Sequence, residues 1–473
     1  MSAMNRIFPF FISFILLSVT MSSQQTTYSK AFMEFLGDAS LSSATVGFTL
    51  VDSKTRHEEF SYSKERSMVP ASSLKVITCA TILEMFGAEY TFKTKLGVKG
   101  KVEDSTLYGD ILIQGEGDPT LMSTYFESHY RELFTDWKSV LAQGGIKHVK
   151  GRVIGVGNYF DQEPLQGSTS IADAGNYYGA GANGLSYKDN AFTIYFKTAA
   201  KDGGRTQVVR TSSKVPGLKI TNLVVASKNS TDNAYIYGIP GTFERVIMGE
   251  LPMGKSEYGI DAALPDPALQ FAYEFQTYLK ESGLTFEKDA ESWLESQLPY
   301  DEKLIRNLAE FASPKLQEIV NTTMKRSVNT FADAMIKHIG KKYFGSGSYE
   351  NGTRALKAVW GERGVPIEGW YQKDGSGLSR ANSITSQQIA LVTAKVNEPF
   401  KAQLKQGMKP LDQGGRVIAK SGYMERVRSY SGYITMSDGS EKAFCIIVNN
   451  HSCTPREMKA KIVRMLERMA TAS

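Results

Sequence analysis

The chain has 473 residues, of which 41% are hydrophobic and 22% charged, composition typical of a soluble globular protein. This length allows two or three domains and a sizeable core. Lys and Arg number 55 and Asp and Glu 49, so the formal net charge is +6, with no block of like charges. A mild basic bias would suit an anionic polymer, although an ordinary mixed surface explains it better, and nothing indicates nucleic-acid binding.

The first segment is typical of a secretory signal. Arg6 precedes an apolar run from Ile7 to Met21, which is followed by small and polar residues. The run is short for a bilayer span. We therefore predict a signal peptide over residues 1–23 and export to the periplasm, with an uncleaved membrane anchor as the alternative.

The next predicted elements are a short helix over Tyr28–Leu36 and a hairpin of strands Ala44–Asp52 and His57–Tyr62. Pro70 then introduces a helix over Ser72–Phe86, whose dense apolar residues predict that it is buried.

From Leu96 to Ile260 short β-type stretches alternate with Gly, Asp and Asn turns, which predicts one or two β-rich modules. These stretches are Ile111–Gln114, Val153–Val156, Phe192–Phe196, Gln207–Val209 and Ala234–Gly238.

Helical periodicity returns after this region, and strands follow near the end of the chain. The predicted helices are Pro267–Ser282, Phe331–Phe344 and Pro455–Ala470, and the predicted strands are Arg416–Ala419, Ser431–Met436 and Ala443–Val448. We expect the N-terminal hairpin and the C-terminal strands to share one sheet flanked by helices, in an α/β (α+β) fold. The predicted domains are a core of residues 24–95 and 261–473 and an inserted β-rich domain of residues 96–260.

Cysteine and histidine give no sign of a metal site or of a disulfide framework. Of three cysteines, Cys79 and Cys445 sit in apolar runs and read as buried hydrophobic residues. The five histidines are scattered and form no ligand motif. We therefore expect no metal and no cofactor, and any catalysis should proceed without histidine.

Three short motifs occur in order: S-x-x-K at Ser72–Lys75, S-x-N at Ser327–Asn329, and K-[ST]-G at Lys420–Gly422. Residues three apart at a helix start lie on one face, so the Lys75 amine can reach the Ser72 hydroxyl. Burial and the helix N-terminus would lower the pKa of Lys75 towards that of a general base. A serine can thus be activated without histidine.

The other two motifs complete this chemistry. Ser327 would relay a proton to the leaving group, while Asn329 would position Lys75 and the substrate amide. Lys420 and Ser421, on an edge strand, would hold a terminal carboxylate of the substrate. The backbone N–H groups of Ser72 and Tyr423 would form an oxyanion hole.

Any one of these short motifs can occur by chance and does not by itself indicate a catalytic site. Ser61 and Lys64 also match S-x-x-K, but they lie in a polar stretch without a helix, and we interpret them as surface residues. Ser227–Asn229 matches S-x-N by chance in the β-rich region.

The three motifs together resemble those of the penicillin-recognising serine D,D-peptidases. Further stretches, Gly109–Leu121, Tyr178–Ala180 and Asp374–Ser379, make nearly the whole chain similar to the class C low-molecular-mass penicillin-binding proteins, the D-alanyl-D-alanine carboxypeptidase/endopeptidase family. The spacing from Ser72 to Ser327 leaves room for the large insertion of this class.

The resemblance implies a serine-β-lactamase/transpeptidase-like core with Ser72 as nucleophile. It also implies that peptidoglycan stem peptides and cross-links are substrates and β-lactams are inhibitors. Asp173 falls where the family has an acidic residue that contacts a diaminopimelate amine; a turn residue is the alternative. Asp374–Ser379 would form a turn bordering the site; a purely structural loop is the alternative. The oligomeric state is not indicated.

Two other functions remain open at this point. The chain could be a β-lactamase or esterase of the same superfamily, although no E-x-x-L-N-type signature stands out and the large insertion favours a polymeric substrate. It could also be a non-catalytic wall-binding protein, against which the intact motif set argues.

Overall fold

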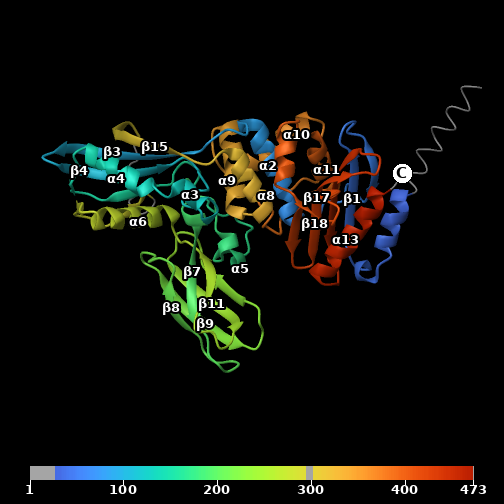
Figure 1. The fold of residues 1–473 in the computed structure, drawn as a ribbon, viewed down its shortest axis with the longest axis horizontal. Helices are drawn as coiled ribbons and strands as arrows, with labels where there is room; N and C mark the ends of the chain where they lie inside the picture. Colours follow the sequence, from blue (N-terminus) through green and yellow to red (C-terminus); the bar gives the residue numbers. More distant parts are fainter. Residues whose placement is uncertain (1–26, 294–301, 472–473) are drawn as a thin grey trace, which may run out of the picture. The chain divides into compact units, whose positions relative to one another are not determined.

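The computed structural model describes residues 27–293 and 302–471 (Figure 1). The predicted signal peptide lies outside the described residues. The chain divides into two compact units: unit 1 comprises Met1–Ala80, Lys357–Gln372 and Ala381–Ser473, and unit 2 comprises Thr81–Leu356 and Lys373–Arg380. The predicted domain boundaries at residues 96 and 260 are not tested by this division and stay a prediction.

Unit 1 contains a six-stranded antiparallel sheet in the order β16-β17-β18-β19-β1-β2. The strands are β1 (Thr45–Asp52), β2 (Glu58–Tyr62), β16 (Lys409–Pro410), β17 (Val417–Met424), β18 (Val427–Thr435) and β19 (Glu441–Asn449). The prediction that the N-terminal hairpin and the C-terminal strands share one sheet is confirmed, because β1 pairs with β19 along its whole length.

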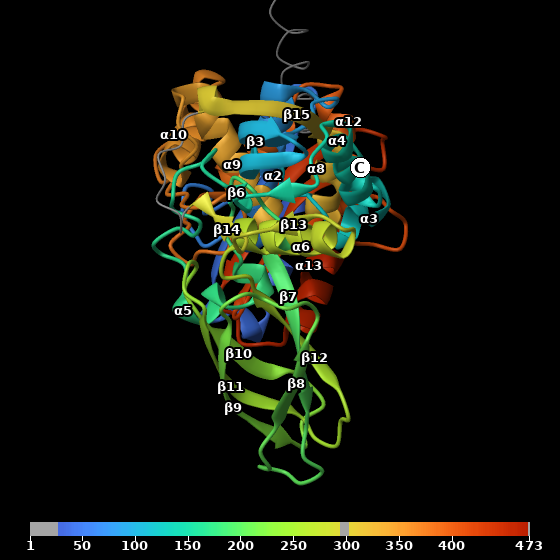
Figure 2. The same ribbon diagram turned by 90° about the vertical axis from the view of Figure 1, so that its left-hand side faces the viewer.

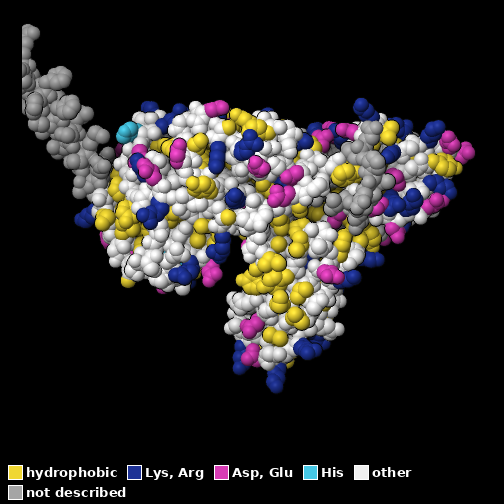
Figure 3. All heavy atoms as spheres, turned by 180° about the vertical axis from the view of Figure 1, so that it is seen from behind, with side chains coloured by type: hydrophobic (Ala, Val, Ile, Leu, Met, Phe, Trp, Pro, Cys, Tyr) yellow, Lys and Arg dark blue, Asp and Glu magenta, His cyan; other side chains and the backbone are white. Residues whose placement is uncertain are grey.

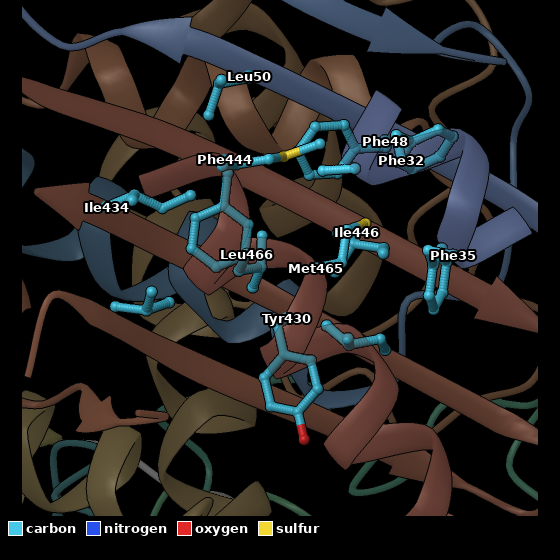
Figure 4. Close-up of a cluster of buried hydrophobic side chains, with 14 of the residues drawn as sticks. Phe32, Phe35, Phe48, Leu50, Tyr430, Ile434, Phe444, Ile446, Met465 and Leu466 are labelled. Carbon is cyan, nitrogen blue, oxygen red and sulfur yellow. The ribbon is translucent and has the colours of Figure 1, made fainter. Parts of the chain in front are cut away.

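Helices cover both faces of this sheet. On one face Phe48, Ile446 and Tyr430 alternate inward and pack against a helix over residues 27–36 and against α13 (Pro455–Ala470) (Figure 4). On the other face α11 (Ser386–Lys395) approaches the strands: Thr49 lies 2.9 Å from Ser386, hydroxyl to hydroxyl. The period-2 alternation of the strands therefore fixes a sheet between two helical layers.

The end of the sheet that matters for function is β17. Strand β16 pairs only with Ile418 and Ala419, whereas β18 pairs with β17 from Val417 to Met424. From Lys420 onward β17 is therefore an edge along which an extended peptide can add by backbone hydrogen bonds. The strand predicted over Arg416–Ala419 continues to Met424, and the predicted placement of Lys420 and Ser421 on an edge strand is confirmed.

Unit 2 has a seven-stranded sheet whose longest strands are β3 (Lys93–Glu103) and β4 (Thr106–Gly115). The others are β5 (His148–Val149), β6 (Val153–Val156), β13 (Thr285–Phe286), β14 (Glu291–Ser292) and β15 (Ile305–Ala312). It packs on α6 (Pro267–Glu281) and α4 (Leu133–Gln143). No helix was predicted at α4, although its buried Leu133, Trp137 and Leu141 recur every four residues.

A second β-rich module in unit 2 consists of two three-stranded sheets, β12-β7-β8 and β10-β11-β9 (Figure 2). The strands are β7 (Ala191–Lys197), β8 (Gln207–Thr211), β9 (Lys219–Ser227), β10 (Asn233–Tyr237), β11 (Glu244–Pro252) and β12 (Tyr258–Ala263). Phe192, Ile194, Ile236 and Ile247 share its core. The predicted β-rich character of this region is thus observed, with each predicted stretch inside or nearly coincident with a strand.

The remaining helices of more than one turn are α2 (Lys75–Phe86), α8 (Leu316–Arg326), α9 (Asn329–Phe344), α10 (Tyr349–Glu362) and α12 (Phe400–Gln406). Acidic and basic side chains are interspersed on the face seen in Figure 3, as the mixed composition indicates. Within the described ranges, no helix has the length and apolar character that a bilayer span requires.

Candidate active site

Ser72 and Lys75 are in contact in unit 1. Ser72 lies in a 3-10 turn, η2 (Ala71–Leu74), and α2 begins only at Lys75, so the predicted helix start at Ser72 is wrong by one turn. The prediction that the amine reaches the hydroxyl is confirmed: Lys75 Nζ donates to Ser72 Oγ at 3.0 Å. Lys75 is fully buried, whereas Ser72 is half-buried. A buried amine touching an accessible hydroxyl is the arrangement that base activation of a serine requires.

The turn that carries Ser72 is fixed against the sheet. Ser73 Oγ donates to the Pro70 carbonyl at 2.8 Å, and Ser429 Oγ of β18 donates to the same carbonyl. Ser429 also lies 3.0 Å from the Ser73 hydroxyl. These side chains are buried, so the bonds hold the turn without competition from water.

Gly422 of the K-S-G motif lies directly against this turn. A Cβ at Gly422 would lie 2.2 Å from Ser429 Oγ, 2.6 Å from the Pro70 carbonyl oxygen and 2.9 Å from Ser73 N. Because two of these atoms are backbone atoms, they cannot move away without displacing the turn.

We therefore expect Gly422→Ala to slow acylation about 100-fold, since a shift of about 1 Å in a reacting group costs that much. The thermal midpoint should also fall, because overpacking costs about 1–3 kcal/mol. Acylation kinetics and thermal unfolding measure the two effects. Gly37→Ala is the matched control, because its Cβ would meet nothing nearer than 3.5 Å. Unchanged kinetics in Gly422→Ala would show that the turn tolerates displacement.

Lys420 is the second buried lysine of unit 1. Its amine donates to the Ser421 carbonyl at 2.7 Å and is 3% exposed. Burial holds the pKa of Lys420 well below its usual range, and the nearby charge of Lys75 lowers it further. Two adjacent buried amines disfavour a doubly protonated pair. In the same strand Ser421 is half-buried, Gly422 is buried and the Tyr423 side chain is 54% exposed.

Ser327 and Asn329 lie in unit 2, where α8 ends and α9 begins. Ser327 adopts left-handed backbone angles, φ 61° and ψ 36°, which non-glycine residues rarely adopt outside functional or turn positions. Asn329 is the first residue of α9, and its Nδ2 donates to the Tyr178 carbonyl at 2.7 Å. The break between the two helices thus places Ser327 at the end of α8 and Asn329 at the start of α9.

Asp173 also lies in unit 2, in the one-turn helix α5 (Ile171–Ala174). Burial raises the pKa of its carboxyl, while a hydrogen bond with the Tyr178 side chain and the charge of Arg380 oppose the increase. Tyr178 thus bonds Asp173 through its side chain and Asn329 through its carbonyl. Sequence reasoning assigned no role to Tyr178 or Arg380, although Tyr178–Ala180 was singled out as a family stretch.

Position 179 in the Tyr178–Ala180 stretch has no room for a side chain, which explains why it is a glycine. A Cβ at Gly179 would lie 1.9 Å from the Asp173 carbonyl oxygen, so α5 and the Tyr178 loop touch through their backbones. This contact, together with the hydrogen bonds of Tyr178, fixes Asp173 relative to Asn329.

Asp374–Ser379 form the predicted turn, and Asp374 organises it. The buried Asp374 carboxylate accepts from Gly377 N and from Ser379 N, each at 2.7 Å. Gly375 N donates to Asp333 of α9 at 3.0 Å, which ties the turn to the helix that follows Asn329. That the turn borders a catalytic site stays a prediction.

The second copies of S-x-x-K, at Ser61 and Lys64, and of S-x-N, at Ser227–Asn229, have different surroundings from the motifs at Ser72 and Ser327. Lys64 forms an ion pair with Glu58 at 2.9 Å, and Ser61 donates to the same carboxylate at 2.8 Å. Ser227 ends β9, and Asn229 Nδ2 donates to Glu250 at 3.2 Å. Lys64 and Asn229 are therefore each engaged with a carboxylate.

The three cysteines are free thiols. Cys79 and Cys445 are buried, as predicted, and burial raises the pKa of Cys79 to about 12, so it is an unreactive thiol. Along the two described stretches, no group of three or more His, Cys, Asp and Glu side chains is arranged to hold a metal ion.

The structure thus brings together two sets of predicted site residues. Unit 1 holds Ser72, Lys75 and the Lys420–Tyr423 segment, and unit 2 holds Ser327, Asn329 and Asp173. Within each set the residues are joined by hydrogen bonds or lie on one short element.

Comparison with known proteins gives a consistent result. The family model described as "D-Ala-D-Ala carboxypeptidase 3 (S13) family" matches residues 29–469. The chain is 27% identical to the D-alanyl-D-alanine carboxypeptidase of Actinomadura sp. strain R39, over 88% of this chain and 80% of that protein. It is 23% identical to the D-alanyl-D-alanine carboxypeptidase DacB of Haemophilus influenzae, over 88% of each chain.

Among solved structures, the chain is similar to penicillin-binding protein 4 of Haemophilus influenzae, with a TM-score of 0.75 and 20% sequence identity. The match covers 90% of this chain and 96% of that structure, which shows that the two share their fold. The predicted transpeptidase-like core with its antiparallel sheet flanked by helices is therefore confirmed. The chain belongs to the D-Ala-D-Ala carboxypeptidase 3 (S13) family, the class C low-molecular-mass penicillin-binding proteins, and is a serine-type peptidase.

Proposed function

We propose that the protein cuts D-alanyl bonds of peptidoglycan stem peptides and cross-links through an acyl-enzyme on Ser72. The observation that carries this proposal is the 3.0 Å contact between Lys75 Nζ and Ser72 Oγ, on a turn fixed to the K-S-G strand. This contact provides a nucleophile and its base in one place without histidine.

In the first step Ser72 Oγ attacks the D-alanyl carbonyl carbon, and its proton passes to neutral Lys75. The carbonyl oxygen becomes an oxyanion, which the N–H groups of Ser72 and Tyr423 stabilise. Collapse of this intermediate breaks the peptide bond, and a proton relayed through Ser327 leaves with the amine. Water then hydrolyses the ester and restores the Ser72 hydroxyl.

The roles of the remaining residues follow from their chemistry. Lys420 and Ser421, with the edge of β17 at Gly422, would hold the terminal carboxylate of the substrate. Asn329 would orient Lys75 and the substrate amide. A free D-Ala leaving group makes the reaction a carboxypeptidase reaction, whereas the amine of a second stem peptide makes it an endopeptidase reaction.

We also propose that β-lactams acylate Ser72, by the same attack on a strained carbonyl. A β-lactam complex of the Haemophilus influenzae penicillin-binding protein 4 supports this for a relative of the same fold. The pattern of residues 1–23 supports a location in the periplasm, where the polymer lies.

Mass spectrometry of purified wall fragments tests the function. After incubation with the protein, pentapeptides should lose D-Ala or cross-linked dimers should split, and Ser72→Ala should do neither. Unchanged fragments with the wild-type protein would contradict the proposal.

A further prediction concerns Asp173, which we propose selects a side-chain amine on the substrate. Asp173→Asn removes the charge but keeps the size, so turnover of amine-bearing stem peptides should fall about tenfold, the usual value of one charge-assisted hydrogen bond. N-acetylated stem peptides should be affected less than twofold. Equal losses on both substrates would contradict this role.

The same proposal predicts a pH dependence. Burial raises the pKa of Asp173, so the carboxylate becomes protonated at a higher pH than an ordinary aspartate as the pH falls. Selectivity for the amine-bearing peptide should therefore be lost below this raised pKa, and Asp173→Asn should show no such loss. Selectivity measured from pH 4 to pH 8 tests this expectation.

A further inference from the structure

A groove of about 870 Å³ begins at the S-x-N motif and lies wholly within unit 2. Ser327 and Asn329 are part of its lining, and β7 and β12 contribute Thr193 and Asp261. Sites of about 300–1,000 Å³ hold ligands far larger than one amino acid. The groove therefore has room for much more than a D-Ala leaving group.

We propose that this groove binds the stem peptide that is released when a cross-link is cut. This inference rests on the proposed function, because it assigns Ser327 to the leaving group. A ligand that extends from the leaving amine along this groove is part of the leaving half of the substrate. In a cross-link that half is a whole stem peptide with free carboxylates.

The charges of the groove suit such a ligand. Arg326 directly precedes Ser327, and Arg131 follows the short helix α3 (Glu127–Tyr130); both are exposed and line the groove. Neither forms an ion pair with a described residue. Their guanidinium groups are thus available for the two-pronged binding of carboxylates that arginine favours.

Two of the acidic residues that line the groove, Asp189 and Asp261, accept hydrogen bonds from neutral donors. Asp189 Oδ2 accepts from Thr124 N at 3.2 Å and from Thr124 Oγ1 at 3.0 Å. Asp261 accepts from the Thr193 hydroxyl at 2.7 Å. Glu127 of α3 also lines the groove, and among the described residues none of these three carboxylates forms an ion pair with Arg131 or Arg326.

Two tyrosine rings line the groove, and each packs edge-on against another ring. Tyr125 is 45% exposed and meets Phe331 of α9 edge-on, with ring centroids 6.1 Å apart. Tyr177 is 55% exposed and meets Tyr178 edge-on at 5.4 Å. Burial raises the pKa of Tyr125, and the charges of Asp189 and Tyr177 raise it further, so these groups lie near one another. Such rings offer large contact area at little entropic cost.

The backbone at Lys188 and Asp189, which also line the groove, is strained. Lys188, Asp189 and Asn190 have φ values of 49°, 59° and 55°, three consecutive non-glycine residues in the left-handed region. Strain of this kind persists only where the surroundings enforce it, and it is common at ligand clamps. It places Asp189 against Thr124 in the groove wall.

The test compares two substrates. Arg326→Gln and Arg131→Gln should each lower kcat/KM for a cross-linked tetrapeptide dimer about tenfold, mainly through KM, because each removes a charge-assisted contact. D-Ala release from a monomeric pentapeptide should change less than twofold. Lys325→Gln is the matched control: it is exposed in the same turn of α8 but does not line the groove, and it should change neither reaction.

Failure of the groove proposal and failure of the proposed function would give different results. Equal losses on both substrates, no loss in either arginine variant, or a wild-type protein that releases D-Ala but does not cut dimers would overturn the groove proposal while leaving acylation of Ser72 intact. A wild-type protein that turns over neither substrate and is not acylated by penicillin would instead refute the proposed function, and the groove proposal with it.

Discussion

Ser72→Ala is expected to reduce D-Ala release and dimer cleavage to below about one thousandth of the wild-type rate. Removing the hydroxyl removes the atom that forms the ester, and only binding and oxyanion stabilisation remain. The rate of D-Ala release measured with an amino-acid oxidase assay quantifies the loss.

Ser73→Ala is the matched control for Ser72→Ala. Ser73 is the neighbouring serine in the same turn, but its hydroxyl donates to the Pro70 carbonyl and is buried. We expect Ser73→Ala to lower stability by about 1 kcal/mol, the usual net value of a hydrogen bond, and to retain most activity. If Ser73→Ala were inactive and Ser72→Ala active, the assignment of the nucleophile would be wrong.

Lys75→Met is expected to slow acylation by about 10³- to 10⁴-fold, the range that a positioned general base contributes. Methionine has a similar length and is apolar, so it fills the buried position without leaving an unpaired charge. Binding of an uncleaved substrate analogue should change little, because Lys75 is assigned to proton transfer. Stopped-flow acylation by a chromogenic β-lactam separates the two effects.

Lys75→Met should also change the pH dependence of carboxylate binding by Lys420. The charge of Lys75 contributes to the low pKa of Lys420, so Lys75→Met should let the pKa of Lys420 rise towards its usual range. Because a lysine with a depressed pKa loses its charge at a lower pH, the alkaline loss of carboxylate binding should move to higher pH in the variant. If the pH at which carboxylate binding is lost were the same in the variant and the wild type, the proposed proximity of the Lys75 and Lys420 amines would be contradicted.

The contact between the nucleophile and its base could be predicted from the sequence, because both residues lie within one helical turn of the chain. Residues at i and i+3 must share a helical face, and Lys75 indeed contacts Ser72 even though the turn is 3-10. Short β-type stretches between Gly, Asp and Asn turns predicted β4, β6, β7, β8 and β10, whereas β3, β9, β11, β12 and β15 were not predicted. Lys420 and Ser421 were correctly predicted on an edge strand, but the apolar pattern alone ended that strand at Ala419, because K-S-G lacks apolar alternation and its pairing depends on β18.

The sequence pattern predicted the sheet shared by the two ends of the chain, but it did not predict individual contacts between distant residues. That Gly422 must be glycine follows from Pro70 and Ser73, which are about 350 positions away in the chain. Tyr178 links Asp173 to Asn329 only because the chain returns to α9 after a long excursion. The groove beside Ser327 also combines segments between Met122 and Asp261, and of these only the Tyr178 segment belongs to a family stretch singled out from the sequence.

The most direct test of the central claim is to locate the covalent bond. Wild-type protein incubated with benzylpenicillin, digested and analysed by tandem mass spectrometry should carry one adduct, on Ser72, and Ser72→Ala should carry none. An adduct on another residue, or an unmodified protein under conditions in which it remains folded, would contradict the assignment of Ser72 as the acylated nucleophile.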